Sequence, residues 1–311
     1  MGRYIRKRLL QAVPVVFGIT ILTFFIMKMA PGGPLTGMIS PRTSSESLQR
    51  AREALGLNDP IIVQYWNWLK QLVQGNFGYS TYNGQAVLTE ILDRLPATLL
   101  LTVTSFVISF VVGIPLGVYS ATHKYSKADY GLTVFSFIGI YIPRFFFGMG
   151  LIFVFALKLK WLPTSGFGSS TFNGEGMALI MPALVMSLSN LATVMRFARS
   201  SMIETLNQDY VRTARAKGLS EKVVIYRHAL KNSMIPVITI FGQSIPNLFG
   251  GAYITEKVFG WPGMGLLGVD AINNRDYQML MGLTLFTAIL VLLGNLLADI
   301  MYSFVDPRIR Y

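Results

Sequence analysis

Long runs of apolar residues alternate with short, mostly basic polar stretches along this chain of 311 residues. A helix needs about 20 apolar residues to cross the hydrocarbon core of a bilayer. The pattern therefore predicts an all-α integral membrane protein with six transmembrane helices. The predicted spans are Leu9–Met29, Ala97–Ala121, Tyr130–Leu157, Met177–Phe197, Met234–Tyr253 and Gln278–Phe304. The first run is longer than the roughly 7–15-residue core of a cleavable signal peptide, so we interpret it as a retained span.

The positions of Lys and Arg set the orientation, because short cytoplasmic loops are enriched in these residues. Basic residues cluster before the first run, between the second and third, between the fourth and fifth, and after the last. Both termini are therefore predicted to be cytoplasmic. The expected organisation is a first span with its N-terminus (1–29), a small extracytoplasmic insert that opens with a Pro-Gly turn at 31–34 (30–96), a core of five spans (97–303) with a cytoplasmic loop at 201–233, and a cytoplasmic tail (304–311).

Composition excludes several classes of function. The chain is 52% hydrophobic and only 14% charged, with mean hydropathy +0.49, whereas soluble proteins carry about 25% charged residues. It has no cysteine and two histidines, so thiolate chemistry and a multi-histidine metal centre are excluded. It also lacks the Gly-x-x-x-x-Gly-Lys-Ser/Thr loop that cradles phosphates. We expect no catalytic residues, no metal site and no nucleic-acid binding, and we attribute the net charge of +12 to the basic loops.

Of the charged residues within the predicted spans, two lie at least five residues from a span end, where charge is costly. Arg144 follows Pro143 inside the third run. It is either a pathway residue that attracts a carboxylate such as a peptide C-terminus, or a cation that reaches headgroups or an internal partner because the span is kinked. Asp299 lies toward the cytoplasmic end of the last run. A proton-coupled transporter could use it, but a snorkelling or paired carboxylate near the interface is the favoured interpretation.

The loop between the fourth and fifth spans is polar, basic and patterned as two short helices. The first, Asp209–Lys217, should end at Gly218, because glycine readily adopts the left-handed conformation after a helix. Ser220 is expected to cap the second, Glu221–Asn232. The small residues of the first helix, which would allow close approach to a partner, are Thr213, Ala214 and Ala216. Its cations, which could pair with carboxylates on that partner, are Arg212, Arg215 and Lys217. The alternative is a basic helix lying on anionic lipid.

This loop resembles the EAA loop of permease subunits in binding-protein-dependent ABC importers, in the variant of the oligopeptide/dipeptide/nickel branch. The resemblance rests on Asp209-Tyr210-Val211-Arg212-Thr213-Ala214-Arg215-Ala216-Lys217-Gly218, followed by His228-Ala229-Leu230-Lys231-Asn232 and Pro236. Arg212 and Thr213 stand where the general loop has Glu and Ala. Further matches cover most of the chain: Gly75–Ser80, Arg94–Thr98, Glu256–Gly265, Arg275–Tyr277 and Asp306–Arg308.

The resemblance implies a type I ABC importer permease fold in a bacterial or archaeal cell membrane. A second homologous permease subunit would complete the path, two ATPase subunits would bind ATP and Mg, and an extracytoplasmic binding protein would deliver oligopeptides or dipeptides. Nickel chelates and oligosaccharides are alternative substrates, and a stand-alone secondary transporter or channel is the competing class. The implied ATPase-coupling residues are Asp209, Tyr210, Arg212, Thr213, Ala214, Arg215, Ala216, Lys217, Gly218 and His228. We expect His228 to be a hydrogen-bonded helix residue.

The Gly-rich segment around Trp261, Pro262 and Gly263 resembles the last outer loop of the family. It is either an outer gate that contacts the binding protein or a tight re-entrant turn with an aromatic anchor.

Overall fold

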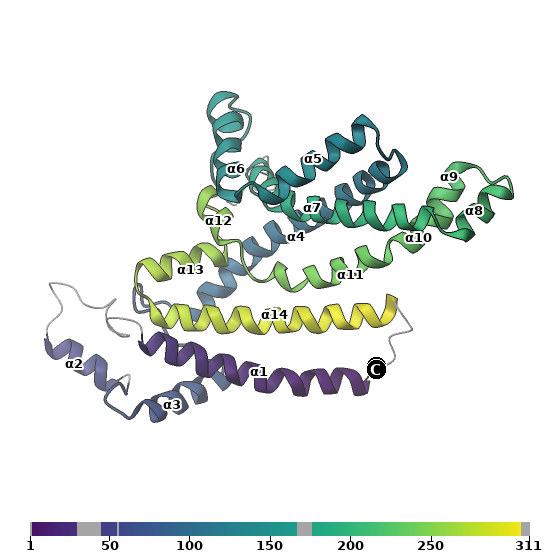
Figure 1. Ribbon diagram of the computed structural model, residues 1–311. Helices are drawn as coiled ribbons and strands as arrows, with labels where there is room; N and C mark the ends of the chain where they lie inside the picture. The colour runs from purple at the N-terminus through teal and green to yellow at the C-terminus, as the bar shows by residue number, and fades with distance from the viewer. Residues whose placement is uncertain (1, 30–44, 55, 167–175, 306–311) are drawn as a thin grey trace.

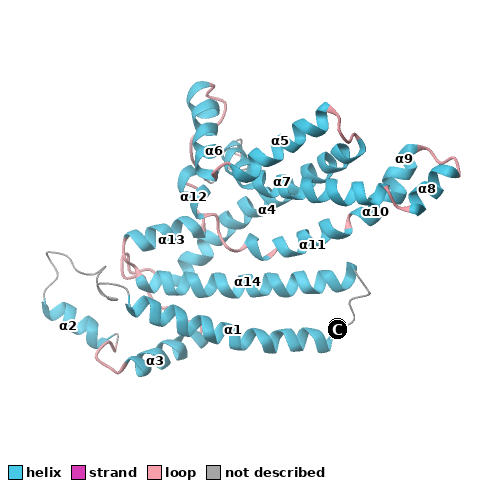
Figure 2. Cartoon of the chain, in the orientation of Figure 1, coloured by secondary structure: helices cyan, strands magenta, loops and turns pink. Residues whose placement is uncertain are grey.

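The computed structural model describes residues 2–29, 45–54, 56–166 and 176–305. The expected turn at 31–34 and the motif at 306–308 lie outside these residues. Within them the chain is helical apart from loops and one isolated β-bridge between Tyr79 and Ala86, as Figure 2 shows. The predicted all-α class is therefore confirmed.

Among the described residues, four helices are long and apolar enough to cross a membrane: α1 (Gly2–Met29), α4 (Val87–Thr122), α7 (Met177–Leu206) and α14 (Tyr277–Val305). Helices α4 and α7 pack against each other over much of their length (Figure 1). The approach is close: a Cβ atom at Gly117 would lie 2.5 Å from the carbonyl oxygen of Met195. Small residues commonly allow such contact between membrane helices.

The predicted third span is not one helix. It consists of α5 (Lys127–Tyr141), α6 (Arg144–Leu151) and the π-helix η2 (Ile152–Lys158), with a bend of 107° between the two halves. Pro143 causes the break, because it lacks an N–H and disfavours helical geometry at the preceding residue. Ile142 is accordingly extended, with φ −67° and ψ 126°.

The predicted fifth span is also irregular. Its longest regular piece is α11 (Ile235–Ser244), which follows α10 (Leu230–Ser233) and precedes the short 3₁₀ helix η4 (Pro246–Leu248). Backbone hydrogen bonds continue across the first break, from Met234 N to the oxygen of Leu230 (3.1 Å). A continuous span to Tyr253 was wrong, because prolines interrupt the hydrogen-bond ladder at 236 and 246. The described residues thus contain four helices that are long and apolar enough to cross a membrane, or five if the bent pair is one span.

Two ends of the molecule are distinguished in Figure 1. One end carries α2 (Ser45–Ala54), α3 (Ile61–Val73), α12 (Tyr253–Phe259) and α13 (Met264–Asn273). The other carries α8 (Asp209–Ala216) and α9 (Glu221–Val223), together with the end of α14. Helix α1 runs antiparallel to α14, since Arg8 pairs with Asp299 and Phe24 packs near Met281.

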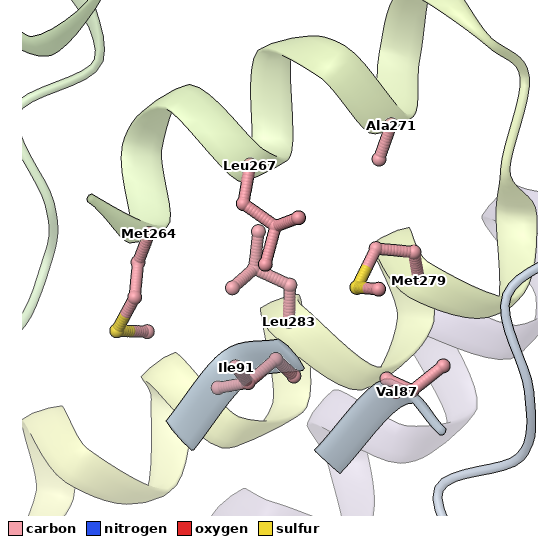
Figure 3. Packing of buried hydrophobic residues seen from close by; sticks show 7 residues of the cluster. All are labelled: Val87, Ile91, Met264, Leu267, Ala271, Met279 and Leu283. Carbon is pink, nitrogen blue, oxygen red and sulfur yellow. The ribbon is translucent and has the colours of Figure 1, made fainter. Parts of the chain in front are cut away.

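The end with α13 has its own apolar core. In Figure 3, Met264, Leu267 and Ala271 of α13 point toward α14 and the start of α4. They meet Met279 and Leu283 of α14 and Val87 and Ile91 of α4, all buried. Helix α4 therefore begins ten residues before the apolar run that predicted it, because its first turns are covered by protein.

Candidate functional site

Helix α8 sits on an apolar base and presents a polar ridge. Val211 and Ala214 are buried against Met202 of α7 and against Val224 and Ala229 of the π-helix η3 (Val224–Ala229). The outward residues are exposed: Asp209, Tyr210, Arg212, Thr213, Arg215, Ala216 and Lys217. Ala214 therefore packs inward. The prediction that it allows close approach to a partner was wrong, because it shares the buried helix face with Val211, three residues before it.

The turn after α8 has a well-defined cap. Gly218 has φ +75°, its N–H donates to the oxygen of Arg215 (2.9 Å), and the N–H of Leu219 donates to that of Ala214 (3.4 Å). This is the Schellman arrangement, in which a left-handed glycine satisfies the last carbonyls of a helix. The predicted helix end at Gly218 is confirmed. Ser220 does occupy the N-cap of the next helix, but its side chain forms no capping hydrogen bond.

Three polar contacts hold α8 to the segment that follows it. The Arg215 guanidinium donates to both carboxylate oxygens of Glu221 (2.7 and 3.2 Å), and the Asn232 amide donates to the Tyr210 hydroxyl (2.9 Å). The hydrogen bond from Arg215 lowers the pKa of the Glu221 carboxyl. Arg212 has only a longer contact with Asp209 (3.6 Å). Arg212 and Lys217 therefore present the charges most available to a partner.

His228 lies half-buried on η3, behind the exposed ridge. Among the described residues its imidazole forms no hydrogen bond, so the expectation of a hydrogen-bonded histidine was wrong. The predicted helix Glu221–Asn232 is present as α9, η3 and α10, with its middle widened into a π-helix. The expected loop at 201–233 begins later than predicted, because α7 continues to Leu206.

An ion pair missed by the sequence analysis fixes the base of this segment. Arg199 of α7 donates to both oxygens of the buried Asp129 at the start of α5 (2.7 and 2.8 Å). Asp129 also accepts from Ser120 of α4 (2.5 Å) and from the backbone N–H of Tyr125 (2.9 Å). Three helices, α4, α5 and α7, are thereby joined at one point. An acidic residue in the first turn of an otherwise apolar run was the available signal.

At the opposite end, the Gly-rich loop wraps around a buried carboxylate. Glu256 accepts hydrogen bonds from Leu266 N (2.8 Å), Thr98 Oγ1 (3.2 Å) and Ala252 N (3.3 Å). Gly263 passes so close that a Cβ atom there would lie 2.4 Å from Glu256 Cδ. The Trp261 indole is 1% exposed and donates to the oxygen of Ala97 (2.8 Å). The Trp261 indole therefore attaches this loop to α4 inside the protein.

A second carboxylate joins two motifs that are far apart in sequence. Asp276 is buried and accepts hydrogen bonds from Ser80 Oγ, from the N–H and hydroxyl of Thr81 (3.2 Å each), and from Met279 N (3.1 Å). The motifs at 75–80 and 275–277 therefore form one contact that ties the insert to the start of α14.

The two charged residues well inside the predicted spans, Arg144 and Asp299, have partners. Arg144 is the first residue of α6, directly after the break, and donates to Ser189 Oγ of α7 (2.9 Å). Asp299 pairs with Arg8 of α1 (3.1 Å), so it is a paired carboxylate and not an isolated proton site. The Trp261 indole and the Arg144 guanidinium donate to different residues, Ala97 and Ser189.

Comparison with known proteins agrees with this architecture. Residues 113–311 match the family described as the inner membrane component of binding-protein-dependent transport systems, and residues 1–102 match its N-terminal component. The oligopeptide transport system permease protein AppB of Bacillus subtilis is 48% identical over 318 residues, with all of both chains covered. The glutathione transport system permease protein GsiC of Escherichia coli is 38% identical over 311 residues, again covering both chains fully. This chain therefore belongs to the family of inner membrane components of binding-protein-dependent transport systems, as a multi-pass permease subunit.

Proposed function

We propose that this subunit forms half of the path through which an ATP-driven importer moves oligopeptides or dipeptides. Full-length similarity to an oligopeptide permease and to a permease for glutathione, itself a small peptide, supports this substrate class. A second homologous permease would form the other half, and an extracytoplasmic binding protein would deliver the substrate. ATP and Mg would be bound by two partner ATPase subunits, so no catalytic residue is required here.

The proposed topology has six crossings with both termini in the cytoplasm, as in type I importer permeases. The bent α5–α6 pair would supply one crossing and the irregular α10–α11 stretch another. The start of α1 and the end of α14 lie at the same end as α8, which supports this orientation (Figure 1). The basic residues of α8 are then on the cytoplasmic side, where Lys and Arg are enriched.

One observation supports the proposed mechanism: one face of α8 is buried against the protein and the other is exposed. Val211 and Ala214 anchor it to α7 and η3, while Arg212 and Lys217 remain exposed. A helix attached in this way transmits a push to the helices beneath it. We infer that α8 occupies a groove on an ATPase subunit. Closure of the ATPase dimer would shift α8, and with it α7 and the Asp129–Arg199 pair, between two orientations of the path.

The test is charge reversal on the ridge. Arg212→Glu combined with Lys217→Glu should abolish copurification of the ATPase subunits and ATP-driven uptake, while membrane insertion is unchanged. These two cations are preferable to Arg215, whose replacement would also break its pair with Glu221. Lys124→Glu is the matched control, because Lys124 is an exposed cation at the same end but lies outside α8. Normal ATPase binding by the double variant would refute the docking role of α8.

Nickel chelates and oligosaccharides remain alternative substrates within the family, and mass spectrometry of ligand bound to the purified complex distinguishes them from peptides. A stand-alone carrier is the alternative of a different class. It predicts solute flux through the purified chain in liposomes without any ATPase, whereas the importer predicts none.

A further inference from the structure

Helix α7 carries a polar strip along one face. Ser189, Thr193, Arg196 and Ser200 are spaced by four, three and four residues, so they lie one above another on the helix. Arg144 extends the strip at one end through its hydrogen bond to Ser189 (2.9 Å). Ser189 lies near the middle of this 30-residue helix, and Arg196 lies about 10 Å further along it at 1.5 Å per residue.

The part of the strip beyond Ser189 lines a cleft of about 450 Å³ between α5 and α7. Thr133 and Ser136 of α5 line it together with Thr193, Arg196 and Ser200 of α7. The Arg196 guanidinium lies over the Phe137 ring, 5.4 Å from its centroid, and remains exposed. Among the described residues, no acidic side chain lines this cleft.

The two cations of the strip are not neutralised. Within the described part of the chain, neither Arg144 nor Arg196 forms an ion pair, whereas Arg199, one turn beyond Arg196, is held by Asp129. Uncompensated cations on a crossing helix face the bundle interior or a water-filled cavity, because contact with hydrocarbon is costly. The opposite edge of the molecule contrasts with this strip: on α1, Leu10, Val13 and Leu22 are exposed and apolar, as lipid-facing residues are.

We propose that this strip is a carboxylate-attracting wall of the translocation path, with Arg144 and Arg196 as successive contacts for the C-terminal or side-chain carboxylates of a peptide. The assignment rests on the proposed function and specifies which charge of the substrate this subunit handles. Guanidinium and hydroxyl groups together are suited to carboxylates, since charge-assisted hydrogen bonds are about twice as strong as neutral ones. Ser189, which Arg144 contacts, lies about 10 Å from Arg196 along α7, so one carboxylate can pass from the first contact to the second.

The strip can be probed without measuring uptake, because the chain has no cysteine. Thr193→Cys in the complete importer should react with water-soluble thiol reagents. We compare the rate of reaction with an anionic methanethiosulfonate to the rate with a cationic one. This ratio should be about tenfold higher for the cysteine at position 193 than for a free thiol in solution. Adding Arg196→Gln should remove most of that preference. Leu22→Cys on the exposed apolar face of α1 is the control and should react with neither reagent.

Uptake gives the second readout. Tetraalanine and its C-terminal amide are compared, each as the ratio of variant to wild-type rate, so that the preference of the binding protein cancels. The double variant Arg144→Gln with Arg196→Gln should lower uptake of the free acid about tenfold more than uptake of the amide. Lys158→Gln is the control and should lower neither, because Lys158 is an exposed cation that lies over Phe153, outside the strip. If the wild type does not carry the amide, the labelling ratio alone decides.

A thiol at 193 that does not react, or an anionic preference that survives Arg196→Gln, overturns the proposal. Equal loss of uptake for the acid and the amide also overturns it. Failure of the coupling mechanism is distinguishable, because ridge variants of α8 would stop uptake of both peptides and leave the labelling ratio unchanged.

Discussion

Replacing Gly263 by alanine tests whether the buried Glu256 carboxylate organises the Gly-rich loop. The new Cβ would lie 2.4 Å from Glu256 Cδ, far inside van der Waals contact, and Glu256 is fully buried. Either the loop or the carboxylate must move. Overpacking of this kind costs about 1–3 kcal/mol. Weakening one hydrogen bond to the carboxylate, such as that from Leu266 N at 2.8 Å, adds about 1.5–3 kcal/mol.

We therefore expect Gly263→Ala to destabilise the purified complex by about 3 kcal/mol, a fall of roughly 6–12 °C in melting temperature at 2–4 °C per kcal/mol. Gly150→Ala is the matched control. Gly150 is a helical glycine, and no atom lies within 4 Å of the position that a Cβ would take, so alanine there should be neutral or slightly stabilising. Thermal unfolding in detergent, followed by tryptophan fluorescence, measures both.

A double-mutant cycle isolates the cause. Glu256→Ala removes the atoms that the new methyl group would meet, so adding Gly263→Ala in that background should cost much less than it does alone. Equal increments in the two backgrounds, or a Gly263→Ala melting temperature matching that of Gly150→Ala, would refute the reasoning.

Three further predictions concern the end with α8. Gly218→Asp should abolish uptake in a transport assay because of its charge. Gly218→Asn should retain most of the uptake, because Asn is neutral, has the same shape as Asp and tolerates the left-handed conformation. There is also room for the side chain, since no atom lies within 4 Å of the position of its Cβ atom. Arg199→Gln should destabilise the complex by about 3 kcal/mol by leaving Asp129 buried and unpaired, and adding Asp129→Asn should recover part of the loss of melting temperature. Because the pKa of Glu221 is lowered, its pairing with Arg215 stabilises the fold above the unfolded-state pKa of Glu221, and this stabilisation is lost as pH falls through the folded-state pKa. Solvent exposure limits the effect to under about 1 kcal/mol. Arg215→Gln should remove this contribution from the acid-side slope of melting temperature against pH.

Local physical rules were sufficient for the elements whose causes are local. Apolar length located α1, α7 and α14, and the glycine after α8 ended that helix where expected, since φ +75° suits glycine best. Proline was recognised at 143, but its effect was underestimated: a proline marks where a helix breaks, whereas the 107° angle depends on what each half packs against.

The sequence by itself determined that this chain is helical, lies in a membrane and carries a basic, helical loop, because those properties follow from composition and short-range spacing. Only the tertiary structure decided which side of α8 is buried, turning Ala214 inward, and which charges are neutralised. Asp129 and Arg199 are 70 residues apart, and Thr98 and Glu256 are 158 apart. Such pairs meet only when helices pack, and periodicity within one segment carries no information about the partner that another segment brings to it.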